Sequence, residues 1–159
     1  MKSYEEYMDS EIEYLSKIPI GWSEVKIKNL VNNKINHFID GDWIESPYII
    51  ESGIKIIQTG NIGVGKYIRK GNRYISSDTF IKLNCTEILP NDILICRLAE
   101  PVGRACQAPN IFKKMITSVD VCRLVAKEIY SNRFIVYFMS MHKYLQSCIP
   151  PKIFKNLAT

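Results

Sequence analysis

Apolar residues recur at intervals of three and four at both ends of the chain. Near the start, this stripe follows the capping-box pair Ser3 and Glu6 and predicts a helix over residues 3–17. Near the other end, aromatic and aliphatic residues repeat with the same period and predict a helix over residues 132–147. We interpret the second stripe as core packing rather than as a cofactor site.

Between these helices, the pattern changes to short alternating runs that glycines and polar residues interrupt. Such runs predict strands, which we expect at residues 25–27, 48–50, 54–58, 66–69, 73–75, 92–98, 103–108 and 117–126. A short helical turn is expected at residues 77–83. The order of helix, many short strands and helix predicts an α+β fold. We expect a single domain, residues 1–159, in which residues 23–126 form a twisted, mostly antiparallel or mixed β-sheet.

The composition agrees with a single domain. A chain of 159 residues with 47% hydrophobic and 23% charged side chains can bury a core without disulfides or metals. The longest uninterrupted apolar run, Phe134–Met139, is much shorter than the about 20 residues of a membrane-spanning helix. The first residues are acidic and contain no apolar signal segment. We therefore expect a cytoplasmic protein that has no membrane partner.

Charge divides the chain into an acidic and a basic part. The net charge of +5 is small, but residues 1–51 carry 5 basic and 10 acidic side chains, whereas residues 52–159 carry 16 basic and 6 acidic ones. The net charges of the two parts are therefore −5 and +10. Such a division indicates a polyanionic partner on one side of the molecule.

The cysteine and histidine residues predict neither a disulfide framework nor a metal site. The five cysteines include no C-x-x-C pair, and His37 and His142 stand far apart in the sequence. We expect reduced, mostly buried thiols, no metal and no cofactor.

The excess of positive charge is concentrated in a glycine-punctuated segment, residues 52–76, which has five basic side chains and no acidic one. Such a segment suits a nucleic-acid backbone, although a basic run is also typical of an ordinary solvated face. A second basic stretch follows at residues 97–114, where an ion pair of Arg97 with Asp92 or Glu100 is the alternative. The residues expected at a nucleic-acid interface are Gln58, Thr59 and Asn61 as base readers or phosphate ligands, Lys66, Arg69, Lys70 and Arg73 along the backbone, and Arg97, Arg104, Lys113 and Lys114 as an extension.

Two other motifs have chemical alternatives. The run Gly60–Lys66 nearly spells a phosphate-binding loop, which would make the chain a nucleotide-binding enzyme. Tyr67 occupies the position of the required Ser or Thr, and the following residues are strand-like, so a glycine-rich hairpin is the favoured interpretation. Asp40 and Asp42 flank a glycine, and we interpret them as part of a turn rather than as a nuclease-like cluster.

Several segments of the chain form an ordered set of motifs. The opening run matches a Y-K-D-S-G-I-E-W-L-G-x-I-P-x-G-W-like pattern at Tyr7, Asp9, Ser10, Ile12, Glu13, Leu15, Ile18, Pro19, Gly21 and Trp22, and departs from it at Met8, Glu11 and Tyr14. The later segments are Gly53–Ile62, Leu89–Ile95, Val102–Arg104 and the helix around Phe134–Tyr144. Together they resemble the target recognition domain of the DNA specificity subunit of type I restriction-modification enzymes, with Asn91 where that family usually has Gly.

This resemblance implies a non-catalytic domain that reads one half of a bipartite site in double-stranded DNA. Modification subunits would supply S-adenosylmethionine-dependent adenine methylation, and a restriction subunit with motor activity would supply cleavage. A full specificity subunit resembles two such domains separated by long conserved spacer helices, and we expect these helices to be absent from residues 1–159. An alternative is an interaction module that binds a methyltransferase through its acidic first helix and apolar last helix.

Overall fold

The computed structural model describes residues 4–31 and 37–148. Its strands are β1 (Tyr7–Asp9), β2 (Lys17–Pro19), β3 (Phe38–Ile39), β4 (Ile54–Ile57), β5 (Tyr74–Ile75), β6 (Ile93–Cys96), β7 (Ala105–Gln107), β8 (Met115–Thr117) and β9 (Val121–Leu124). Its helices are α1 (Ser77–Lys82), α2 (Asn132–Met139) and α3 (His142–Ser147), and its 3-10 turns are η1 (Ile27–Asn29), η2 (Ser46–Tyr48) and η3 (Thr59–Asn61). The predicted α+β class is confirmed.

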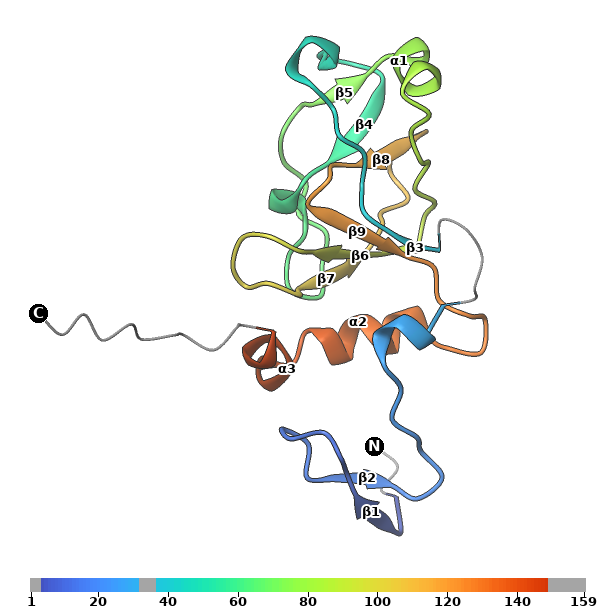
Figure 1. Ribbon diagram of the computed structural model, residues 1–159, viewed down its shortest axis with the longest axis vertical. Helices are drawn as coiled ribbons and strands as arrows, with labels where there is room; N and C mark the ends of the chain where they lie inside the picture. Colours follow the sequence, from blue (N-terminus) through green and yellow to red (C-terminus); the bar gives the residue numbers. More distant parts are fainter. Residues whose placement is uncertain (1–3, 32–36, 149–159) are drawn as a thin grey trace, which may run out of the picture.

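The strands of the described residues form three sheets (Figure 1). β1 and β2 make a separate hairpin, and β3, β9, β6 and β7 make an antiparallel sheet in that order. In the third sheet, β4 lies between β5, to which it is antiparallel, and β8, to which it is parallel. α2 and α3 lie beyond the four-stranded sheet, on the side away from α1 (Figure 1).

Alternation along the central strands divides the core into layers. In β6, Ile93 and Ile95 belong to the cluster that includes α2 and α3, whereas Leu94 packs in the cluster between the two larger sheets. In β4, Ile57 joins the inter-sheet cluster, and Ile56 packs on the opposite face. Successive side chains of a strand point to opposite faces, so both faces of these strands are buried. This burial explains why β6 is a continuous apolar run and why β4 is apolar except for Lys55.

The prediction of a helix over residues 3–17 is wrong. The described part of this segment forms the β1–β2 hairpin, in which Asp9 pairs with Lys17. A helix would place Glu5, Asp9 and Glu13 one turn apart on the same face, where like charges repel. The hairpin instead sets an acidic residue opposite a basic one, which is a favourable cross-strand pair.

The C-terminal helix predicted over residues 132–147 is confirmed, but it consists of two helices, α2 and α3. The Ser131 hydroxyl caps α2 by accepting a hydrogen bond from Phe134 N (3.3 Å). The helices are separated at Met141, whose ψ of 135° is extended rather than helical. None of the helices in the described residues has the length and hydropathy that crossing a membrane requires.

Most strand predictions are confirmed, and the errors share one cause. Residues 54–58, 73–75, 92–98, 103–108 and 117–126 contain β4, β5, β6, β7 and β9, and residues 77–83 contain α1. Residues 25–27 lead into η1, residues 48–50 follow η2, and residues 66–69 contain no strand. The strands β3 and β8 were not expected. Whether each of these segments forms a strand depends on pairing with a segment that is distant in the sequence. The local alternation of apolar and polar residues contains no information about such pairing.

The turn before β6 explains one departure from the family motif. Asn91 has a φ of 71°, in the left-handed region that Gly adopts most readily and Asn better than most other residues. The Asp92 carboxylate closes this turn by accepting a hydrogen bond from Leu89 N (2.9 Å) and also pairs with Arg123 of β9 at 2.7 Å. Asn at this position is therefore compatible with the turn that Gly forms elsewhere.

Candidate nucleic-acid interface

The glycine-rich segment after β4 is a turn that folds the chain back on itself. Gly63 N donates to Lys66 O (2.9 Å), and Ile62 and Tyr67 form an antiparallel bridge. A phosphate-binding loop must open a helix, but the next helix begins only at Ser77. The tight turn of the predicted hairpin is present, but one isolated bridge replaces the expected pair of strands; the nucleotide-binding alternative at Gly60–Lys66 lacks its required geometry.

Asn61, one of the predicted base readers or phosphate ligands, has a structural role in this fold. The residue is 3% exposed, its Oδ1 accepts a hydrogen bond from Gln58 N (2.9 Å), and its Nδ2 donates to Ile68 O (3.0 Å) and Lys70 O (2.8 Å). Since the amide uses its acceptor and both donors within the protein, it has no free donor left for a base edge. It holds the loop that carries the basic side chains against η3.

The loop that Asn61 holds presents four exposed cations, which we call the basic loop: Lys66, Arg69, Lys70 and Arg73. None of the four forms an ion pair within residues 4–31 and 37–148. The stem of Lys70 crosses Gly60 so closely that an added Cβ there would lie 2.6 Å from Cε of the lysine. The structure therefore brings together these four predicted residues as a surface of unneutralised positive charge.

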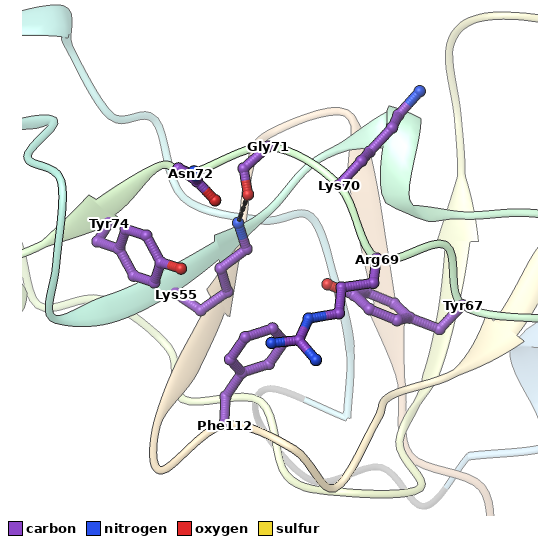
Figure 2. Close-up of a pocket in the computed structure, with 8 residues that line it drawn as sticks. All are labelled: Lys55, Tyr67, Arg69, Lys70, Gly71, Asn72, Tyr74 and Phe112. Carbon is purple, nitrogen blue, oxygen red and sulfur yellow. Dashed lines mark hydrogen bonds between the residues drawn. The ribbon is translucent and has the colours of Figure 1, made fainter.

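Beneath the basic loop lies a hollow of about 300 Å³, which we call the Lys55 hollow (Figure 2). Its lining residues are Lys55, Tyr67, Arg69, Lys70, Gly71, Asn72, Tyr74 and Phe112. Lys55 is 2% exposed, its Nζ donates to Gly71 O (2.6 Å), and the same nitrogen lies 4.9 Å from the ring centroid of Tyr74. Burial of the ammonium lowers the pKa of Lys55.

Tyr67 forms another wall of the Lys55 hollow. Its hydroxyl is buried and has no hydrogen-bond partner among the described residues, and burial raises the pKa of the phenol. Figure 2 shows this hydroxyl turned toward the interior of the hollow, whereas the ammonium of Lys70 points away from it. Lys55 is not among the predicted contact residues, although a lysine inside the otherwise apolar run Ile54–Ile57 is a signal that could have identified it.

A second depression adjoins the other side of β4. Trp43, Gln58 and Arg73 are among its lining residues, and Trp43 is 73% exposed. This exposure is unusual, because indole rings are usually buried, and it does not agree with a role of Trp43 in core packing. Gln58 is half-buried and lines this depression together with Trp43 and Arg73, so it stays a predicted base reader.

Arg104 is the second predicted contact residue that the structure assigns to the fold. It is 8% exposed, and its guanidinium donates to Ile62 O (2.6 Å), Thr59 O (3.0 Å), Pro101 O (3.0 Å) and Ala99 O. Buried and engaged with four main-chain carbonyls, Arg104 ties the β6–β7 connection to η3, which leaves one of its five N–H donors for the predicted DNA contact. Thr59, itself half-buried, contributes its carbonyl to this network.

The remaining predicted cations differ in their surroundings. Arg97 is exposed and forms an ion pair, but its partner is Asp40 rather than an acid near in sequence. Lys114 is half-buried and pairs with Glu87 at 3.4 Å. Lys113 is exposed and takes part in none of the ion pairs of the described residues. Of these three, Lys113 has a charge that no acidic side chain neutralises.

The acids at residues 40 and 42 have separate partners. Asp40 accepts from the Cys122 thiol (2.9 Å) and from Arg97, and both bonds hold the pKa of its carboxyl below the usual value. Asp42 accepts from Thr86 N (3.1 Å), and burial raises its pKa. Within the part of the chain that the structure describes, no group of three or more His, Cys, Asp or Glu residues is placed to hold a metal ion.

The fold is similar to that of solved subunits of restriction-modification complexes. One is a chain from a study of complex assembly and conformational transition of the type I R-M system, with a TM-score of 0.57 and 18% identity over 80% of this chain and 28% of that one. Another is the HsdS subunit from Thermoanaerobacter tengcongensis, with a TM-score of 0.56 and 17% identity over 81% of this chain and 32% of that one. The predicted resemblance to a target recognition domain of a specificity subunit is confirmed in the fold.

This chain spans about three-tenths of the length of those two structures. No family model matches the sequence, and no curated protein does so either.

Proposed function

We propose that this chain binds double-stranded DNA sequence-specifically and reads one half of a bipartite site as the specificity component of a type I restriction-modification system. The observation that carries the proposal is the basic loop, whose four exposed cations have no acidic neighbour in residues 52–76 and form no ion pair with the residues that the structure describes. DNA carries closely spaced phosphate charges, so Lys and Arg that are not already neutralised bind it and release counterions. The fold shared with specificity subunits supports the same function.

The proposal divides the surface by role. Lys66, Arg69 and Lys70 hold the sugar-phosphate backbone, which positions the domain without reading sequence. Gln58 and Arg73, beside Trp43, lie where base edges would be read, because Gln and Arg offer the bidentate pairings that distinguish adenine and guanine. Lys113 extends the backbone contacts. Thr59, Arg97 and Lys114 remain proposed contacts of lower priority, since each already has a bond to another part of the chain.

The chain itself would do no chemistry under this proposal. Residues 1–159 would be one recognition domain in the cytoplasm, and modification and restriction subunits would contribute methylation and cleavage. No cofactor is assigned to this chain.

A selection from a random duplex pool at low salt, followed by binding measurements at several salt concentrations, tests the function. The variant Arg69→Ala/Lys70→Ala should bind every duplex more weakly, and the slope of log affinity against log salt should become shallower by about 1.8 for two lost phosphate contacts. The matched control is Lys28→Ala/Arg133→Ala, which removes the same two residue types from exposed positions near α2, away from the basic loop. Equal binding by the two double variants would refute the proposed surface.

A second function, docking of a methyltransferase subunit, is favoured by a separate observation. Tyr7 on the β1–β2 hairpin and Phe134 and Tyr137 on α2 are 49%, 45% and 67% exposed, so several aromatic rings remain uncovered. Exposed apolar surface of this kind is typical of protein interaction sites. A pull-down with a candidate modification subunit, with and without DNA, would test this. Complex formation without any DNA affinity would favour docking over DNA reading.

A further inference from the structure

The Lys55 hollow contains polar groups whose bonding is incomplete. An ammonium has three N–H donors. That of Lys55 makes one hydrogen bond, to Gly71 O (2.6 Å), and no ion pair with any described residue. Lys55 as a whole residue is only 2% exposed, and a largely desolvated ammonium without a charged partner is costly unless a ligand or partner compensates it.

The position of Lys55 in β4 makes this burial unavoidable. Side chains alternate along a strand, so Lys55 shares its face with Ile57, which belongs to the core between the two larger sheets. The neighbouring rings of Tyr74 and Phe112 lie 4.9 and 6.0 Å from Nζ and stabilise the cation only through their faces. These contacts hold the ammonium in the hollow but leave two of its donors unused.

Tyr67 supplies an independent indication of a missing acceptor. In the part of the chain that the structure describes, its buried hydroxyl has no hydrogen-bond partner, although buried polar atoms are almost always hydrogen-bonded. Arg69 adds a guanidinium on the same wall, and Figure 2 shows it between Phe112 and the Tyr67 hydroxyl in this view. The ammonium of Lys55, the phenol of Tyr67 and the guanidinium of Arg69 can all donate hydrogen bonds, and a ligand that accepts from all three would be an oxyanion.

We propose that the Lys55 hollow seats one backbone phosphate of the bound DNA, with Lys55, Tyr67 and Arg69 as donors to its oxygens. This inference rests on the proposed function, because the basic loop that would hold the DNA also forms the rim of the hollow. A phosphodiester fits the donor set, since Arg and Lys bind phosphate oxygens through charge-assisted hydrogen bonds. Such a seat would fix the register of the duplex on the domain, whereas the outward-pointing Lys70 would contribute charge alone.

The test uses two variants and a matched control on a duplex selected for the wild-type chain. Lys55→Met keeps the length of the side chain without its charge, and Tyr67→Phe removes only the hydroxyl. Lys28→Met makes the same substitution at an exposed site away from the hollow. Circular dichroism and thermal unfolding establish that each variant is folded before binding is compared.

We expect Lys55→Met to bind the duplex about tenfold more weakly, as the loss of one charged hydrogen bond predicts. Its salt slope should be shallower by about 0.9, and Lys28→Met should match the wild type. Duplexes in which single phosphates are replaced by uncharged methylphosphonates provide the sharper readout. One position should weaken binding by the wild type and not by Lys55→Met, and Tyr67→Phe should be less sensitive than the wild type at that same position.

The outcomes separate this inference from the proposed function. If Lys55→Met keeps the affinity, salt slope and methylphosphonate profile of the wild type while Arg69→Ala/Lys70→Ala loses binding, the domain reads DNA and the phosphate seat is refuted. If neither variant changes binding, the proposed function fails as well. If inorganic phosphate binds the wild type but not Lys55→Met in a calorimetric titration, and DNA binding is unaffected by the substitution, the hollow holds a free anion and the backbone assignment is overturned.

Discussion

Replacing Asn61 by alanine is the most direct test of how the basic loop is held. The amide accepts from Gln58 N and donates to Ile68 O and Lys70 O at 2.8–3.0 Å, and the side chain is almost completely buried. Asn61→Ala removes all three bonds. It also leaves a main-chain N–H without its partner at the start of η3 and two carbonyls without theirs in the loop.

The magnitude follows from the count of bonds. Each neutral hydrogen bond contributes about 0.5–1.5 kcal/mol net, so three of them predict a loss of about 1.5–4.5 kcal/mol in the free energy of unfolding. The carbonyls of Ile68 and Lys70 belong to exposed residues that water reaches, which favours the lower half of this range. For a urea m-value of about 2 kcal/mol per M, a loss of about 2–3 kcal/mol lowers the unfolding midpoint by about 1–1.5 M.

Urea unfolding followed by circular dichroism measures this shift, and Asn72→Ala is the matched control. Asn72 is the same residue type in the same loop, but it is exposed, so its replacement should change the free energy of unfolding by less than about 0.5 kcal/mol. Hydrogen exchange should show faster exchange around residues 66–72 in Asn61→Ala only. A midpoint equal to that of Asn72→Ala, together with an altered choice of DNA sequence, would refute the structural role and restore Asn61 as a base reader.

Four further predictions test the core and the electrostatics. Leu94→Ala should cost about 2–5 kcal/mol in urea unfolding, because the side chain is fully buried between the sheets. Arg104→Met should lower stability by about 2–4 kcal/mol in the same assay, since four main-chain carbonyls lose their donor; a change within 0.5 kcal/mol, typical of a surface substitution, would contradict that role. Burial raises the pKa of Cys106 to about 12, so an aromatic disulfide reagent at pH 8 should label it only after unfolding, and rapid native labelling would count against the structure. The folded-state pKa of Asp42 is raised above its unfolded value, so the contribution of this carboxyl to stability decreases as pH rises from the unfolded pKa to the folded pKa. In Asp42→Asn this decrease should be absent when the free energy of unfolding is measured between about pH 3 and 7.

Local pattern predicted the central strands because both of their faces are buried. Ile93–Cys96 is wholly apolar and Ile54–Ile57 is apolar except for Lys55, and turn residues bound both runs. The cap and stripe of α2 were equally readable, because they involve residues within one or two turns of each other. The same local reasoning failed at residues 3–17, where a helical stripe was present but pairing with β2 and the repulsion between neighbouring acids favoured a hairpin.

At the candidate interface, too, the sequence predicted local features but not those that depend on distant segments. Charge counting found the segment that carries the basic loop, and Lys66, Arg69, Lys70 and Arg73 are all exposed on it. Charge and residue type did not distinguish these residues from Asn61 and Arg104. Those two side chains are equally suited to DNA contacts, but they donate hydrogen bonds to main-chain carbonyls of other segments. Charge counting also passed over Lys55, although the position of this lysine inside an apolar run is a signal in the sequence; its bonding in the hollow is visible only in the folded structure.

The sequence by itself determined the α+β class, most of the strands, the helical C-terminal segment and the location of positive charge. These features depend on composition and on spacing over a few residues, which the order of amino acids states directly. Tertiary structure alone decided which polar side chains face solvent, which hold the fold and which line the hollow beneath the basic loop. Burial and hydrogen bonding arise from residues far apart in the chain, so they exist only once β4, β8 and the loop around Asn61 are packed together.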